Sequence, residues 1–217
     1  MFNKPVQDWV RATAMRLMRK VADLPITPNE ITVSGLLFTL VVAWLAATGN
    51  IFVAGVVLGI SSVTDIADGA LARARNQPTD YGAFFDSLLD RVGEAVTGLG
   101  LIVYYANHGH GLEGALLVYL SVCGALMVSY AKARAEGLGI ECNVGFMQRP
   151  ERVVMTCAGM LLFPFGGIWI LSASLWVLIV TTFFTTAQRL LHVYRVTNPA
   201  PEIPRKPRVV RRRRIAS

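Results

Sequence analysis

Residues 31–64 read ITVSGLLFTLVVAWLAATGNIFVAGVVLGISSVT, which is 34 positions without a charged side chain. A second uncharged run of 36 residues lies between Arg152 and Arg189, and residues 95–131 carry only Glu113. A helix needs about 20 apolar residues to cross a bilayer, so each run is long enough for two crossings and a short turn. Backbone polar groups in lipid must be bonded within the segment itself, which favours helices. The three runs predict an all-α integral membrane protein.

Turn-forming residues divide these runs. The sequence predicts six transmembrane helices, at about 31–48, 52–76, 80–106, 112–137, 150–165 and 168–195. The breaks between them are rich in Gly, Pro, Asn and His.

Basic residues gather at one end of the expected helices. The turns at the other end, 49–50, 107–111 and 164–167, contain no Lys or Arg. Because Lys and Arg are enriched on the cytoplasmic side of membrane proteins, both termini are predicted to be cytoplasmic. We therefore expect a multi-pass protein of the plasma membrane. The aromatic residues expected to form a belt at the opposite membrane face are Trp44, Tyr104, Tyr105 and Trp169.

The chain divides into three parts. Residues 1–24 hold an expected amphipathic surface helix, and residues 25–197 form the expected six-helix transmembrane domain. Residues 198–217 form a basic tail that we expect to be disordered, with seven bases and one acid. The net charge of +7 therefore comes mostly from the tail. Because no aromatic residues are interleaved with these bases, we expect no nucleic-acid partner.

Four aspartates lie inside the expected helices, toward the cytoplasmic ends. Asp65 and Asp68 are three residues apart on the second helix, and Asp86 and Asp90 are four apart on the third. Ionisable groups inside membrane helices are costly and usually mark function. A short link joins the two helices, so we expect them to be antiparallel neighbours with all four carboxylates in one small volume. Hard oxygen donors at this density suit Mg²⁺, Mn²⁺ or Ca²⁺.

Structural ion pairing is the alternative explanation for these acids. The candidate partners are Arg73, Arg75, Arg91 and Arg134. Four acids at helical spacing, with Gly69 and Gly82 aligned to them, disfavour this alternative. Only Glu94 and Arg91 are expected to form structural pairs.

The stretch Asp65-x-x-Asp68-Gly69-x-x-Ala72-Arg73, followed after eight residues by Gly82-x-x-x-Asp86-x-x-x-Asp90, resembles the full signature of the CDP-alcohol phosphotransferase (CDP-alcohol phosphatidyltransferase) family. Six spans, cytoplasmic termini and an N-terminal surface helix also fit that family. The resemblance implies an enzyme of phospholipid synthesis. It would transfer the phosphatidyl group of CDP-diacylglycerol to the hydroxyl of an alcohol and release CMP.

The resemblance also implies a role for each residue of the motif. Asp65, Asp68, Asp86 and Asp90 would be metal ligands for two ions of Mg²⁺ or Mn²⁺, and Asp90 would also be the catalytic base. The residues implied in binding the CDP-lipid are Gly69, Arg73, Gly82, Thr27, Pro28, Asn29 and Thr32. Membership would further imply a homodimer whose active site faces the cytoplasm.

A second basic set follows the signature and includes Arg189. Its members that we expect to bind an acceptor phosphate are Lys132, Arg134, Arg149, Arg152 and Arg195. Bidentate contacts from Arg suit phosphate, which favours a phosphorylated acceptor over free serine, choline or inositol. Anchoring at the cytoplasmic membrane face is the alternative role for each of these residues.

The acceptor itself is indicated by local resemblance. The segments 129–136 and 149–152 are similar to bacterial phosphatidylinositol-phosphate synthases, which implies inositol phosphate as the acceptor. Gln148 stands where an acid is common in those enzymes. A phosphatidylglycerophosphate synthase that uses glycerol 3-phosphate therefore stays the alternative within the family.

Two other classes also place acids in membrane helices. A carboxylate-lined cation transporter would hold them near the midplane, often in broken helices related by internal repeats, and the sequence shows no such repeat. An intramembrane prenyltransferase uses Asp-rich helices with Mg²⁺. That class does not require the pattern of Gly69, Arg73 and Gly82.

Overall fold

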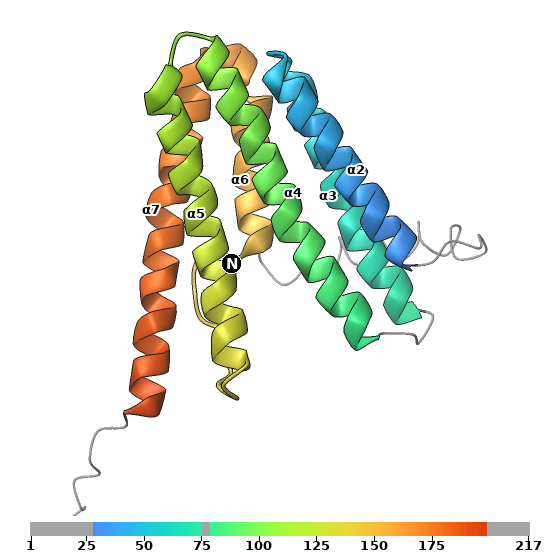
Figure 1. Cartoon of the computed structure of the whole chain (residues 1–217), viewed down its shortest axis with the longest axis vertical. Coiled ribbons are helices and arrows are strands. Elements are labelled where there is room, and N and C mark those ends of the chain that lie inside the picture. Colours follow the sequence, from blue (N-terminus) through green and yellow to red (C-terminus); the bar gives the residue numbers. More distant parts are fainter. Residues whose placement is uncertain (1–27, 75–78, 199–217) are drawn as a thin grey trace, which may run out of the picture.

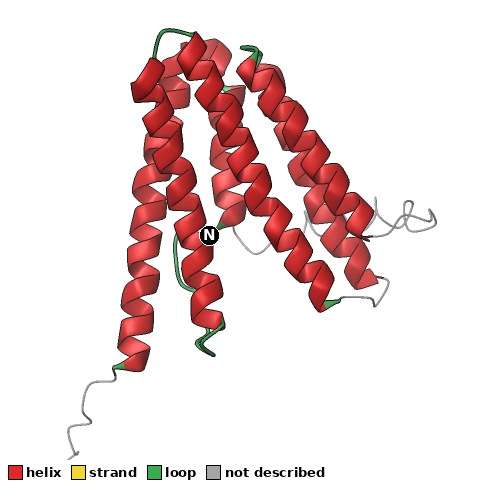
Figure 2. Cartoon of the chain, in the orientation of Figure 1, coloured by secondary structure: helices red, strands yellow, loops and turns green. Residues whose placement is uncertain are grey.

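The structure, a computed structural model, describes residues 28–74 and 79–198, without the side chains of residues 28, 29, 31 and 63–74. Its elements are all α-helices, and the longest described connection is the segment 137–148 (Figure 2). They are α2 (Pro28–Ala47), α3 (Ile51–Ala74), α4 (Asp80–Asn107), α5 (Gly111–Glu136), α6 (Arg149–Leu161) and α7 (Phe163–Thr197). The all-α fold and the six helices are thus confirmed. The expected surface helix and the basic tail from residue 199 onward lie outside the described residues.

The boundary between α6 and α7 differs most from the prediction. Helix α6 ends at Leu161 and α7 already begins at Phe163, although the sequence predicts a turn over 164–167. The interruption is confined to Gly167, whose φ of 56° and ψ of −139° are not helical. Glycine reaches this positive φ without a clash because it has no Cβ. The break therefore lies at Gly167, the end of the predicted turn, and the difference is that residues 163–166 before it form a helical turn.

The six helices form a closed ring. Helix α2 packs against α3 and α4, and the ring continues from α4 through α5, α7 and α6 back to α3. Figure 1 shows α2, α3 and α4 on one side of the molecule and α5 and α7 on the other. Side chains from all six helices line a pocket inside the ring.

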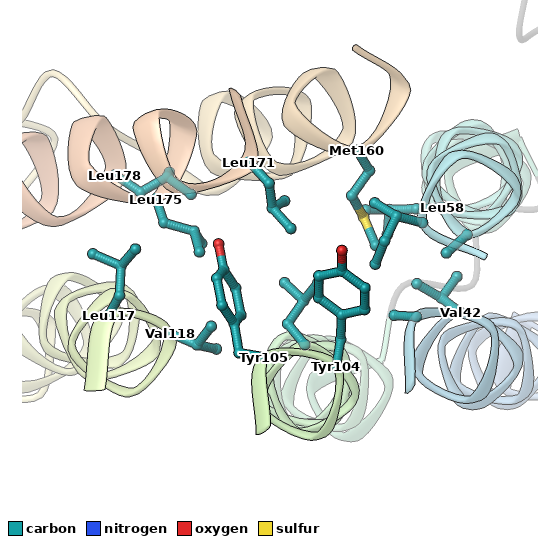
Figure 3. Packing of buried hydrophobic residues seen from close by; sticks show 14 of the residues in the cluster. Val42, Leu58, Tyr104, Tyr105, Leu117, Val118, Met160, Leu171, Leu175 and Leu178 are labelled. Atoms are coloured by element: carbon teal, nitrogen blue, oxygen red, sulfur yellow. The ribbon is translucent and has the colours of Figure 1, made fainter. Parts of the chain in front are cut away.

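The apolar core fills the ring toward the ends where α2 joins α3 and α4 joins α5. Figure 3 shows Tyr104 and Tyr105 of α4 among aliphatic side chains of the neighbouring helices. The two tyrosines are only 5 % and 1 % exposed, whereas Trp44 and Trp169 are 65 % and 78 % exposed. The expected aromatic belt is therefore wrong for the tyrosines. Tyr105 packs in the core, and its buried hydroxyl is satisfied by Ser172 Oγ at 2.8 Å.

Large apolar side chains cover the outside of the ring, among them Leu37, Phe84, Leu99, Trp176 and Phe184. Extensive exposed apolar surface is rare on soluble monomers and marks contact with membrane or protein. Among the described residues, α5 and α7 are long and apolar enough to cross a bilayer, and α2 and α3 contain shorter apolar stretches. Two of the six expected spans are thus supported by length and composition. The full six-span topology stays a prediction.

Candidate active site

One face of α4 presents three acids at steps of four residues: Asp86, Asp90 and Glu94. The helix begins with Thr79 as its N-cap, whose Oγ1 accepts the N–H of Gly82 at 3.0 Å. Asp86 and Asp90 line a small pocket with residues of α2. Glu94 lies one turn further along and lines the pocket inside the ring.

Two arginines of α6 face these acids. Arg149 is the first residue of α6, so Arg152 lies on the same face one turn later. Arg149 Nη2 lies 2.6 Å from Asp90 Oδ1, and its Nε lies 4.0 Å from Glu94 Oε1. Arg152 Nη2 lies 2.8 Å from Glu94 Oε1 and 3.2 Å from Glu94 Oε2, and it donates to Ser129 Oγ at 3.3 Å. Acids and arginines thus alternate from Asp90 to Arg152.

This row of charges borders the central pocket. The pocket has a volume of about 90 Å³. Glu94, Arg149 and Arg152 contribute its charged groups, and hydroxyls of Thr97 and Ser121 line it among apolar side chains. Arg152 is almost fully buried, with 5 % of its side chain exposed. Glu94 pairs with this buried guanidinium. The lining still has two guanidiniums and one carboxylate, which suits an anionic ligand.

The five residues expected to bind the acceptor phosphate divide into two groups. The structure brings Arg149 and Arg152 together at the central pocket. Lys132 pairs instead with Glu136 on its own helix, at 3.6 Å. Arg134 and Arg195 are exposed in the last turns of α5 and α7.

Arg189, expected in the same basic set, has a different role. It is buried on α7, where its Nε donates to the Val144 carbonyl at 3.0 Å and its Nη1 donates to the Val128 carbonyl. Thr185 Oγ1, one turn earlier, accepts the N–H of Met147 at 3.0 Å. These contacts attach the 137–148 segment to α5 and α7, just ahead of Arg149. Arg189 therefore fixes the loop that positions the start of α6.

The structure describes the side chains of only some of the residues expected to bind the CDP-lipid. Thr32 lines the pocket of Asp86 and Asp90, and Gly82 lies in the first turn of α4. Pro28 and Asn29 begin α2. The other expected residues are Gly69 and Arg73, on α3 where side chains are not described, and Thr27, which lies outside the described residues.

The structure describes the side chains of two of the four aspartates expected to bind metal, Asp86 and Asp90. Asp65 and Asp68 lie on α3, again among the side chains that the structure does not describe. Among the described side chains, no group of three or more His, Cys, Asp or Glu is close enough to hold a metal ion. Asp86 and Asp90 line one pocket and offer hard carboxylate oxygens, so the described half fits a divalent cation such as Mg²⁺. The complete metal site stays a prediction.

Glu94, expected only in a structural pair, lies at the site. It stands between Arg149 and Arg152 in the wall of the central pocket. A signal for this placement exists, because Glu94 continues the four-residue spacing of Asp86 and Asp90. Arg91 is not its partner among the described contacts; it donates to the Ser87 carbonyl of its own helix.

Comparison with protein families gives a match over most of the chain. The model of the CDP-alcohol phosphatidyltransferase family matches residues 25–187. The archaetidylinositol phosphate synthase of Methanothermobacter thermautotrophicus is 34 % identical over 89 % of this chain and 96 % of its own. The phosphatidylinositol phosphate synthase of Mycobacteroides abscessus is 36 % identical over 82 % of this chain and 81 % of its own.

Solved structures give a matching fold. The phosphatidylinositol phosphate synthase of Mycobacterium tuberculosis with CDP-DAG bound superposes with a TM-score of 0.77 and 28 % identity, covering 89 % of this chain and 98 % of that one. The same enzyme in complex with manganese and citrate gives a TM-score of 0.76 and 27 % identity, covering 89 % and 93 %.

Proposed function

The chain belongs to the CDP-alcohol phosphatidyltransferase family, and we propose that it transfers the phosphatidyl group of CDP-diacylglycerol to a hydroxyl of inositol phosphate, releasing CMP. One observation carries the proposal for this chain: Asp90 and the arginine pair of α6 meet at one place, with Arg149 Nη2 2.6 Å from Asp90 Oδ1. A phosphorylated alcohol whose phosphate lies on these arginines has its hydroxyl within reach of Asp90.

Asp65, Asp68, Asp86 and Asp90 are the proposed ligands of two divalent ions. The manganese in the structure of a relative and the pocket of Asp86 and Asp90 support this assignment. When bound, the ions neutralise the pyrophosphate of the donor and stabilise charge at the phosphorus that is transferred. The CDP-DAG bound to a relative supports the choice of donor.

Asp90 is the proposed base. Its carboxylate takes the proton of the acceptor hydroxyl while the hydroxyl oxygen bonds to the phosphorus next to the lipid. The bond between this phosphorus and the CMP oxygen breaks, and CMP leaves with that oxygen. Arg149, 2.6 Å from Asp90, holds this carboxylate beside the central pocket before the substrates bind.

Inositol phosphate is the proposed acceptor for two reasons. The arginine pair calls for a phosphate group, which free inositol does not carry. The relatives from Methanothermobacter and Mycobacteroides both have inositol phosphate in their names, although their names differ in the lipid. Glycerol 3-phosphate also carries a phosphate and a hydroxyl and is the second candidate.

The proposed setting is the plasma membrane. The family is membrane-associated, and the apolar outer surface of the ring supports embedding in lipid. We place six spans across the bilayer, with both termini and the site of Asp90 facing the cytoplasm. The proposed assembly is a homodimer.

The test is a panel of acceptors. Purified protein with CDP-diacylglycerol and Mg²⁺ receives one alcohol at a time: inositol 1-phosphate, glycerol 3-phosphate or free inositol. CMP release is expected to be fastest with inositol 1-phosphate and to stay at background with free inositol. Faster release with glycerol 3-phosphate would assign the alternative acceptor, and release with free inositol would contradict the role of the arginine pair.

A further inference from the structure

Arg149 lies at the boundary between two pockets. It lines the pocket between α2 and α4 together with Asp86 and Asp90, and it also lines the central pocket together with Glu94 and Arg152. The proposed function, on which this inference rests, places the CDP-lipid with its metal ions at the first pocket and the acceptor phosphate at the second. Arg149 is thus the charged side chain that faces both substrates.

Arg149 lies closer to Asp90 than to Glu94. Its Nη2 is 2.6 Å from Asp90 Oδ1, while its Nε is 4.0 Å from Glu94 Oε1. The neighbouring Arg152 is held by Glu94 at 2.8 Å. Among the described side chains, the closest acid to Arg149 is Asp90 and the closest acid to Arg152 is Glu94. An anion in the central pocket must therefore compete with Asp90 for Arg149 and with Glu94 for Arg152.

Binding of the donor changes the charge next to Asp90, in the pocket between α2 and α4. Asp86 and Asp90 would hold divalent ions together with the donor. The charge of two such ions would exceed that of the pyrophosphate, so the attraction between Asp90 and Arg149 would weaken. The positive charge of Arg149 then becomes available to a phosphate in the central pocket. By thermodynamic reciprocity, a phosphate on Arg149 strengthens binding of the metal-loaded donor by the same factor.

We propose that Arg149 couples the two pockets, so that the metal-loaded CDP-lipid and the acceptor phosphate bind with positive cooperativity. In this role Arg149 is a positioning residue whose partner changes with the occupancy of the two pockets. Arg152, held by Glu94 and Ser129, supplies the fixed part of the phosphate site.

The test measures binding in the absence of turnover. Inorganic phosphate serves as the probe because it fits the phosphate site but carries no alcohol to react. Its affinity for the full-length protein in detergent with Mg²⁺ is measured by calorimetry, with and without CDP-diacylglycerol. In the unsubstituted protein, CDP-diacylglycerol is expected to tighten phosphate binding by about fivefold or more.

Three variants separate coupling between the pockets from simple affinity for phosphate. Arg149→Gln is expected to make phosphate affinity independent of CDP-diacylglycerol. Arg152→Gln, the matched control, is expected to weaken phosphate binding while CDP-diacylglycerol still tightens it by the original factor. Arg149→Lys keeps the charge on a single ammonium that reaches one pocket at a time. It is expected to lose most of the coupling, and it serves as the test if Arg149→Gln does not fold.

Three results would overturn the coupling. In the first, the phosphate affinity of the unsubstituted protein does not respond to CDP-diacylglycerol. In the second, the Arg149 variants keep the full coupling. In the third, Arg152→Gln loses the coupling although Arg149 is intact. An unsubstituted protein that binds CDP-diacylglycerol without coupling contradicts this inference alone. A protein that does not bind CDP-diacylglycerol at all contradicts the proposed function as well.

Discussion

Asp90 is the residue at which the two halves of the proposed reaction meet. It shares a pocket with Asp86 on the donor side, and its Oδ1 is 2.6 Å from Arg149 on the acceptor side. Replacing one carboxylate oxygen by an NH2 group removes the proton acceptor and the negative charge that favours a metal ion, while keeping the size of the side chain. The effect on chemistry is therefore expected to exceed the effect on folding.

Asp90→Asn is expected to lower the rate of CMP formation by at least about 100-fold, because a positioned base contributes that much or more. Binding of CDP-diacylglycerol, followed by calorimetry, is expected to stay measurable. Glu113→Gln is the control, since Glu113 lies in the first turn of α5 at the other end of the helices. Near-normal turnover of Asp90→Asn would rule out Asp90 as the base.

Arg152→Ala tests the phosphate site at the same scale. Its loss leaves Glu94 without its closest partner and removes donors from the central pocket. The KM for the phosphorylated acceptor is expected to rise at least about tenfold, in line with the strength of a charge-assisted hydrogen bond, with little change in the KM for CDP-diacylglycerol. Arg91→Ala, at a side chain that bonds its own helix, is the control. Equal rises in both KM values would contradict an acceptor role.

Sequence spacing predicts part of this site. The four-residue steps place Asp86 and Asp90 on one face of a helix, and the same rule extends to Glu94. Spacing says nothing about which arginine crosses to meet them. The partners come from α6, far along the chain, and were chosen by the packing of the ring, so the contact of Arg149 with Asp90 had no local signal.

At the scale of elements, α2 and α4 approach closely at Gly100. A Cβ at this position would overlap the backbone of Ala43. Small residues allow helices to pack in this way, and close packing is a main source of stability between helices in lipid. The approach of α2 to α4 also forms the pocket of Asp86 and Asp90.

Gly100→Ala is expected to destabilise the protein by about 1–3 kcal/mol, because the added methyl group forces the two backbones apart. Thermal unfolding in detergent measures the change. Gly111→Ala is the control, since a Cβ there meets no atom within 4 Å. An unchanged unfolding temperature for Gly100→Ala would show that α2 and α4 are not held as closely as described.

Helix positions are the part of the fold that sequence predicts best. Long uncharged runs and turn residues act locally, so the starts of α3, α4 and α5 lie within a residue of their predicted places. The sequence predicts the break that ends at Gly167. It does not predict that the residues from Phe163 up to this break form a helical turn, because that turn depends on packing. The burial of Tyr104 and Tyr105 likewise depends on neighbours across the ring.

At the scale of the whole molecule, the distribution of basic residues predicts how the ring is oriented in the membrane. Basic residues end α5 and α7 and begin α6, while the turn between α4 and α5 is free of Lys and Arg. The positive-inside rule places the first set in the cytoplasm and that turn outside.

Cysteine labelling tests this orientation. In a background without the three native cysteines, Asn107→Cys is expected to react with a membrane-impermeant maleimide in intact cells. Leu138→Cys, after α5, is expected to react only after the membrane is permeabilised. Both positions are exposed in the structure. Labelling in the reverse order would invert the topology and move the site of Asp90 out of the cytoplasm.

The reaction itself is tested most directly by its products. Purified protein is incubated with CDP-diacylglycerol, inositol 1-phosphate and Mg²⁺, and lipid and nucleotide are quantified together by mass spectrometry. The proposed function predicts equal amounts of CMP and phosphatidylinositol phosphate, and neither product when EDTA removes the metal. CMP without that lipid, or full activity in EDTA, would contradict metal-dependent transfer to inositol phosphate.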